Sequence, residues 1–163
     1  MKAFHSRISC VLKDIEVMHH PPLATHQNVL NLFGYGWNLH EGSIPFLITE
    51  CAFHGTLREF LRNHALHARQ RLKLCRDVTS GLLELHLSGI AHGDLKLDNV
   101  LVQLVGDGAG EPVDPNTDTA GEDNGLHGRN VVAKLADFGH SLLLSPEQYH
   151  GGDNNQRYRG TTA

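Results

Sequence analysis

Asp94, Lys96 and Asn99 form the pattern D-x-K-x-x-N within the stretch HGDLKLDNVLV. This spacing places a carboxylate, an ammonium group and an amide in one short loop between an expected helix and an expected strand. A carboxylate can accept a hydroxyl proton, an ammonium group can neutralise a phosphate, and an amide oxygen is a suitable ligand for Mg²⁺. The pattern therefore favours phosphoryl transfer, in which catalysis is mostly positioning and charge stabilisation.

A second chemical candidate, Asp137, ends an apolar run in the stretch KLADFG. An expected strand would hold its carboxylate beside the Asp94 loop, where it could bridge Mg²⁺ to nucleotide phosphates. Either motif alone is a weak signal, because ordinary turns produce both by chance. Both motifs in this order predict a site in which Asn99 and Asp137 bind the metal.

The elements that must position these residues follow from the spacing of apolar residues. The expected helices are 6–19, 57–64 and 68–88, and the expected strands are 29–35, 44–49, 100–105 and 131–136. Pro21 and Pro22 should end the first helix. The last two strands should pair with each other across the residues that separate them.

Residues 106–130, which separate those two strands, differ from the rest in composition. They include six glycines, two prolines and six acidic residues, but one basic residue and only two aliphatic side chains, Val113 and Leu126. Such a stretch buries too little apolar surface to offset its ordering entropy, so a disordered surface insertion is expected. With six acidic residues and one basic residue, this stretch accounts for the net charge of −4 of the whole chain. The charge of the remainder gives no sign of a nucleic-acid partner.

Bulk composition bounds the class of protein. With 163 residues, 40% of them hydrophobic and 20% charged, the chain can form one globular domain with a core. It has no apolar run of ~20 residues and no signal-peptide pattern, so a soluble cytoplasmic protein without a membrane partner is expected. Its thirteen histidines form no converging ligand set, which ranks a structural metal site low. Cys51 and Cys75 are expected to be small buried apolar groups.

These motifs resemble those of the eukaryotic-type protein kinase family, whose signature includes H-R-D…N and D-F-G. The resemblance implies an α+β, protein-kinase-like fold and transfer of the γ-phosphoryl group of ATP to a protein substrate. D-L-K at 94–96 is similar to the serine/threonine branch. By this resemblance Asp94 is the catalytic base, Lys96 contacts phosphate, and Asn99 and Asp137 bind Mg²⁺.

The flanking residues extend the resemblance. The stretch LITECA is similar to a strand followed by the family's hinge, which makes Thr49 the gatekeeper and gives Glu50 and Ala52 backbone contacts to adenine. The stretch RGTT at 159–162 is similar to the end of an activation segment. The chain is thus expected to be one partial kinase domain over 1–163, with the small lobe and hinge at 6–53 and part of the large lobe at 54–163.

The sequence also departs from the family pattern. A Gly-rich loop, a strand lysine and an A-P-E motif are not found, so a domain truncated at both ends is expected, with the apolar face of helix 68–88 exposed. Asp14 stands at the position of the helix glutamate and is one methylene shorter, and it could equally be a solvated charge. Gly93 replaces an arginine that pairs with a phosphorylated loop. His92 is expected to pack and hydrogen-bond rather than to carry protons.

Two functions therefore remain open. One is an ATP- and Mg²⁺-dependent protein serine/threonine kinase, and the other is a catalytically inactive fragment or a pseudokinase-like binding module. The protein substrate, the regulator and the oligomeric state do not follow from the sequence.

Overall fold

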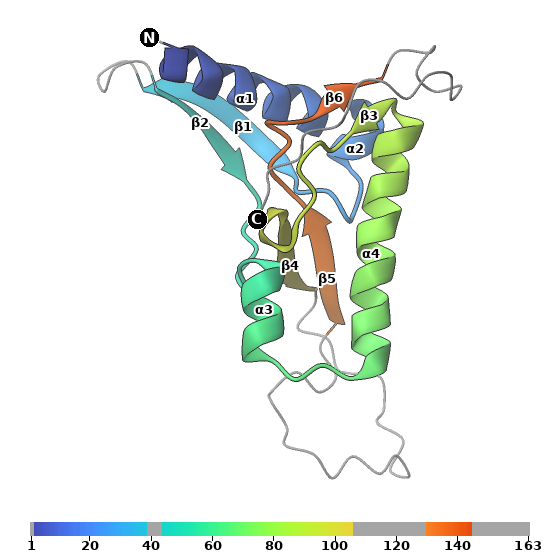
Figure 1. The fold of residues 1–163 in the computed structure, drawn as a ribbon. Coiled ribbons are helices and arrows are strands. Elements are labelled where there is room, and N and C mark those ends of the chain that lie inside the picture. Colours follow the sequence, from blue (N-terminus) through green and yellow to red (C-terminus); the bar gives the residue numbers. More distant parts are fainter. Residues whose placement is uncertain (1, 39–43, 106–129, 145–163) are drawn as a thin grey trace, which may run out of the picture.

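The computed structural model describes residues 2–38, 44–105 and 130–144, which form a mixed helix and strand fold (Figure 1). The helices are α1 (Lys2–Met18), α2 (Pro21–Ala24), α3 (Leu57–Asn63) and α4 (Ala68–Leu87), and η2 (Leu97–Asn99) is a 3₁₀ turn. The strands are β1 (Leu32–Asn38), β2 (Ile44–Thr49), β3 (Ile90–Ala91), β4 (Val100–Val105), β5 (Asn130–Leu135) and β6 (Leu142–Leu143). The expected insertion at 106–130, except for Asn130, which begins β5, and the expected end of an activation segment at 159–162 lie outside the described residues.

The strands form three antiparallel pairs, β1–β2, β3–β6 and β4–β5. The expected pairing of β4 with β5 is confirmed, with Val100 opposite Leu135 and Val102 opposite Ala133. All four residues are fully or almost fully buried and belong to the core. The β3–β6 pair was not expected, because two-residue strands carry no readable alternation.

Helix α1 lies over the β1–β2 pair and contacts both strands (Figure 1). Its last turn is anchored by Val17 and Met18, which are buried in the core. The chain then enters α2 at Pro21, because proline is well tolerated in the first turn of a helix. The first strand begins at Leu32, later than expected, while Val29 makes only an isolated bridge to Leu135.

Helix α4 packs along β5 (Figure 1). The expectation that its apolar face lies exposed is wrong. Leu74 and Leu85 are buried, and Val78 and Leu82 pack against the same core. The leucines that α4 does expose are Leu72, Leu83 and Leu87, with exposed fractions of 68%, 59% and 67%.

The expected burial of two cysteines is also wrong, because Cys51 and Cys75 are exposed. Cys51 lies in the turn after β2, and Cys75 lies on the side of α4 away from the core. Among the helices described here, none is both long and apolar enough to cross a bilayer.

Candidate active site

The loop that follows β3 brings Asp94, Lys96 and Asn99 together. The Asp94 carboxylate accepts a hydrogen bond from Lys96 Nζ at 2.6 Å and one from Asn99 Nδ2 at 3.1 Å. Asn99 Nδ2 also donates to the Asp94 carbonyl at 2.9 Å. The Asp94 side chain is only 9% exposed, so these contacts fix its orientation. The hydrogen bond to Asp94 also raises the pKa of the Lys96 ammonium group, which keeps it protonated.

Gly93 gives this loop its shape. It has a φ of 84°, a left-handed conformation that side chains other than glycine rarely adopt. A Cβ atom at this position would overlap the carbonyl oxygen of His140. The arginine that Gly93 replaces by resemblance therefore cannot be accommodated in this arrangement, and the chain near His140 packs against the bare backbone instead.

His92 supports the loop from the core side. It is buried, its Nε2 lies 3.2 Å from the Ala136 carbonyl, and its Nδ1 accepts from the Asp94 N–H at 3.4 Å. These partners require a neutral ring with the proton on Nε2. Burial lowers the pKa of His92, which favours that neutral form. Its expected packing and hydrogen-bonding role is confirmed.

Asp137 follows the end of β5 and lies close to the Asn99 backbone, because the N–H of Ala136 donates to the Asn99 carbonyl at 2.9 Å. Asp137 has a φ of 60° and is the only non-glycine residue with positive φ in the described ranges. This turn leaves Asp137 exposed while Phe138, next in the chain, is completely buried. Such strained backbone is typical of functional turns.

Helix α1 holds the turn at 137–141 through three side chains. The Asp14 carboxylate accepts from the Phe138 N–H at 2.6 Å, and Lys13 Nζ donates to the Ser141 carbonyl at 3.1 Å. Cys10 packs against Gly139 so closely that a Cβ on the glycine would lie 2.8 Å from the cysteine Cβ. Asp14 is therefore a structural contact and not a solvated helix charge. Burial raises the pKa of the Asp14 carboxyl group to about 6. The hydrogen bond from the Phe138 N–H acts in the opposite direction with a smaller effect.

The residues expected at the hinge, Glu50 and Ala52, follow β2. The Glu50 N–H donates to the Asn31 carbonyl, and the Ala52 carbonyl accepts from Gly55 at 3.1 Å. These bonds leave the Glu50 carbonyl and the Ala52 N–H without a backbone partner in the part of the chain that the structure describes. They are therefore the groups at this hinge with capacity for an external ligand.

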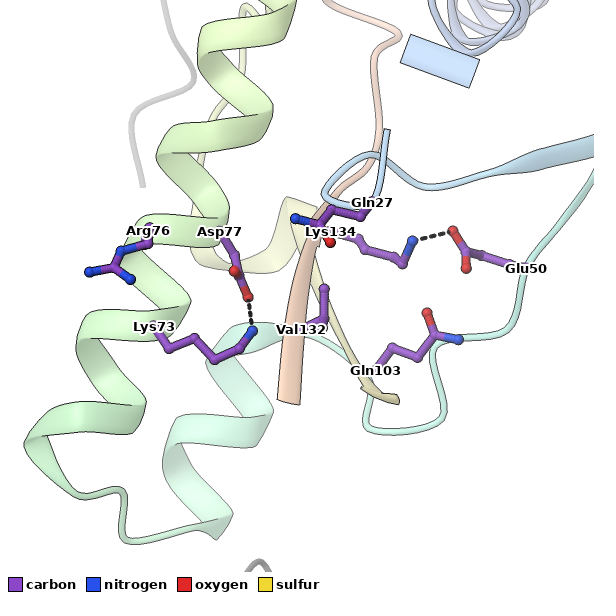
Figure 2. A pocket seen from close by; sticks show the side chains of 8 residues that line it. All are labelled: Gln27, Glu50, Lys73, Arg76, Asp77, Gln103, Val132 and Lys134. Carbon is purple, nitrogen blue, oxygen red and sulfur yellow. Dashed lines mark hydrogen bonds and ion pairs between the residues drawn. The ribbon is translucent and has the colours of Figure 1, made fainter. Parts of the chain in front are cut away.

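The Glu50 side chain makes contacts that sequence reasoning missed. Its Oε1 lies 2.8 Å from Lys134 Nζ and accepts from the Asn31 N–H at 2.7 Å (Figure 2). The Glu50 and Lys134 side chains are 14% and 10% exposed. This ion pair ties the segment that follows β2 to β5, three residues before Asp137. Lys134 lies on the face of β5 opposite to the core residues Val131, Ala133 and Leu135, and a lone lysine in an apolar strand was the only sequence signal for this pair.

The oxygen atoms near this turn suit a hard divalent cation. The Asp137 carboxylate is exposed and has no protein partner among the residues described, and Asn99 uses its Nδ2 for Asp94, which leaves Oδ1 available. A carboxylate oxygen and an amide oxygen are ligands that Mg²⁺ prefers. The residues present therefore fit the metal that the sequence suggested.

Comparison with known proteins agrees with this geometry. The family model described as protein tyrosine and serine/threonine kinase matches residues 2–160. The serine/threonine-protein kinase shk1/pak1 of Schizosaccharomyces pombe is 33% identical over 99 residues, which cover 60% of this chain and 14% of that protein. A probable serine/threonine-protein kinase of Dictyostelium discoideum is 29% identical over 116 residues, covering 70% of this chain and 21% of that protein.

The serine/threonine-protein kinase PrkC of Bacillus subtilis is 27% identical over 128 residues, which cover 78% of this chain and 18% of that protein. The chain thus spans about a fifth or less of each of these three relatives. The family match, however, covers nearly all of the chain, and it includes both the Asp94 loop and the Asp137 turn. The chain belongs to the protein tyrosine and serine/threonine kinase family.

Proposed function

We propose that this chain carries the phosphotransfer site of an ATP-dependent protein serine/threonine kinase. The observation that supports it most directly is the Asp94 carboxylate, which is held by Lys96 and Asn99 in a loop hydrogen-bonded to the residue before Asp137. The relatives named as serine/threonine-protein kinases and the D-L-K sequence at 94–96 support hydroxyl groups of serine or threonine as acceptors.

Each residue has a defined task in this proposal. Asp94 orients the acceptor hydroxyl and takes its proton, and Lys96 neutralises charge on the transferred phosphoryl group. Asn99 and Asp137 would hold Mg²⁺, which supplies charge neutralisation of the nucleotide phosphates when it is bound. The Glu50 carbonyl and the Ala52 N–H, which have no backbone partner among the described residues, would bind the adenine edge.

The test is a thermal-shift titration of the purified chain with Mg·ATP, followed by transfer of labelled phosphate to a serine-containing acceptor protein. We expect the melting temperature to rise with Mg·ATP, and the rise to be lost in Asp137→Asn. Asp94→Asn should keep the nucleotide response but lower the transfer rate about 10²-fold or more, because general-base catalysis contributes about that much.

Asp98→Asn is the matched control, because Asp98 lies in the same loop but pairs with Arg58 at 2.8 Å on the surface. It should leave both nucleotide binding and transfer close to wild type. A cooperative melt that does not respond to Mg·ATP would contradict the proposal. It would favour the alternative, a kinase-like module without catalytic activity.

A further inference from the structure

A cavity lies between α4, the β4–β5 pair and the segment that follows β2 (Figure 2). Its volume is about 500 Å³, and its lining residues are Gln27, Glu50, Lys73, Arg76, Asp77, Gln103, Val132 and Lys134. None of the four residues to which catalytic or metal-binding tasks are assigned above belongs to this lining, and Glu50, whose backbone carbonyl is proposed to bind adenine, contributes its side chain. We propose that the cavity binds a phosphate-bearing ligand, held chiefly by Lys73 and Arg76.

The acceptors in the cavity wall are already engaged. Asp77 Oδ2 accepts from Lys73 Nζ at 2.8 Å and from the Ala133 N–H at 3.1 Å. Glu50 Oε1 likewise receives two donors, Lys134 Nζ and the Asn31 N–H. Each carboxylate is thus neutralised by a lysine and bound to a backbone donor, so neither is set up to bind a cationic ligand.

The hydrogen-bond donors in the cavity wall are only partly engaged by protein acceptors. Lys73 and Lys134 each offer three N–H groups and have one side-chain acceptor apiece, and Arg76 offers five. The Arg76 guanidinium has no ion-pair partner within the described ranges, and the amides of Gln27 and Gln103 also lack protein partners there. This excess of donors selects a ligand that is rich in acceptors.

The charge and polarity of the lining narrow the chemical class of the ligand further. Three cations face two carboxylates, and Val132 is the only apolar residue among the eight, so the wall suits an anion rather than an apolar ligand. Figure 2 shows Lys73 directed toward β5 and Arg76 at the rim with its guanidinium turned outward. Because Arg76 is exposed, its long side chain can swing across the opening. A phosphate group, with several oxygens, matches donors that approach from separate walls.

The test is an NMR titration of the full chain with inorganic phosphate at constant ionic strength, read at the side-chain amides of Gln27 and Gln103. These signals separate the cavity from phosphate binding near Lys96. Saturable shifts of both amides are expected. Arg76→Gln should weaken the apparent affinity roughly tenfold, the size expected for a lost charge-assisted hydrogen bond. Arg71→Gln, an exposed arginine of α4 outside the lining, should leave it unchanged.

A second titration with O-phosphoserine identifies the source of the phosphate group. Tighter binding than inorganic phosphate would support a phosphorylated side chain as the ligand, and equal binding would support a free phosphate compound. Absence of saturable shifts at Gln27 and Gln103 would overturn the proposal. Equal weakening by Arg76→Gln and Arg71→Gln would also overturn it, since that result indicates only long-range attraction to a basic helix.

Discussion

Asp14 shows how one side chain can link α1 to the Asp137 turn. Its carboxylate is half-buried, and its folded-state pKa is about 6 against 3.8 for the ordinary group. A raised pKa means that the fold favours the protonated acid. The contribution of Asp14 to stability is therefore complete below about pH 4 and is lost as the pH rises through about 6.

Asp14→Asn should consequently raise the free energy of unfolding at pH 7.5. The amide resembles the protonated acid, and its oxygen can still accept from the Phe138 N–H. We expect a gain of about 1 kcal/mol, after discounting the pKa shift for solvent around a half-buried group, and a gain near zero at about pH 4. Urea unfolding at both pH values measures it, with Glu16→Gln on the exposed side of α1 as control. A gain that is independent of pH would contradict this account.

Gly93 and Gly89 allow the cost of a left-handed backbone to be separated from the cost of a steric clash. Both have positive φ, but a Cβ at Gly89 would meet nothing closer than the Leu144 carbonyl at 3.7 Å, whereas at Gly93 it would overlap the His140 backbone. Gly89→Ala should lower the free energy of unfolding by about 1 kcal/mol, the cost of conformation alone. Gly93→Ala should cost at least about 2 kcal/mol.

Denaturant unfolding of the two variants measures this difference. Gly93→Arg, which restores the residue found in the resembling family, should be at least as unstable as Gly93→Ala. Equal losses for the two alanine variants would mean that the chain near His140 moves away at little cost.

At the level of single residues, sequence could identify the chemistry but not the constraints around it. Asp94, Lys96, Asn99 and Asp137 were found because their types and spacing are short-range signals. The need for glycine at position 93 depends on a residue 47 positions away, and no local pattern reports that contact.

Among the elements, the ion pair that links the end of β2 to β5 is the clearest structural device. Lys134 and Glu50 form a largely buried ion pair, so removing one partner leaves the other charge without compensation. Lys134→Met should lower the free energy of unfolding by about 3 kcal/mol. Glu50→Gln should cost less, because its amide oxygen can still accept from the Asn31 N–H.

The double variant Lys134→Met/Glu50→Gln tests whether the two residues act as a pair. It should be more stable than Lys134→Met alone, because the unpaired carboxylate is then absent. The matched control is Arg58→Met with Asp98→Asn, an exposed pair whose side chains are 41% and 42% exposed and whose coupling should be much weaker because solvent screens it. Additive losses at Lys134 and Glu50 would contradict a direct coupling.

The elements themselves were predicted where their patterns are long. The expected helix 68–88 and the expected strand 44–49 agree with α4 and β2 to within one residue. The β3–β6 pair escaped prediction because it joins two dipeptides that are 52 residues apart in the chain. The apolar face of α4 was identified correctly, but the expectation that this face lies exposed was wrong. It is covered by β5 and not by a later helix.

For the molecule as a whole, the motifs predicted the family that the comparisons then showed. The α+β class followed from that resemblance more than from periodicity, since several strands are too short to specify a topology. The division into two lobes and the tasks of the site residues stay predictions. Neither the lobe division nor these tasks can be tested from the arrangement of helices and strands alone.

The surface of the whole molecule carries one further consequence. Leu72, Leu83 and Leu87 lie along one side of α4, because steps of eleven and four residues return to the same helical face, and all three are well exposed. Leu83 and Leu87 are one turn apart and adjoin, whereas Arg76 and Thr79 lie on the same side between Leu72 and Leu83. An exposed leucine pair of this kind favours association. We expect Leu83→Glu/Leu87→Lys to reduce concentration-dependent self-association of the chain in sedimentation velocity.

The same variant should change the melting temperature little, because neither side chain contributes to the core. Leu74→Ala is the contrasting control: Leu74 is 3% exposed, so its truncation should cost about 2 to 5 kcal/mol without reducing association. If the surface variant melted as early as Leu74→Ala, the two leucines would be part of the packed structure. If it associated as strongly as the wild type, another surface would be responsible, with the exposed aromatic residues of β1 and β2 the next to test: Phe33, Tyr35, Trp37 and Phe46.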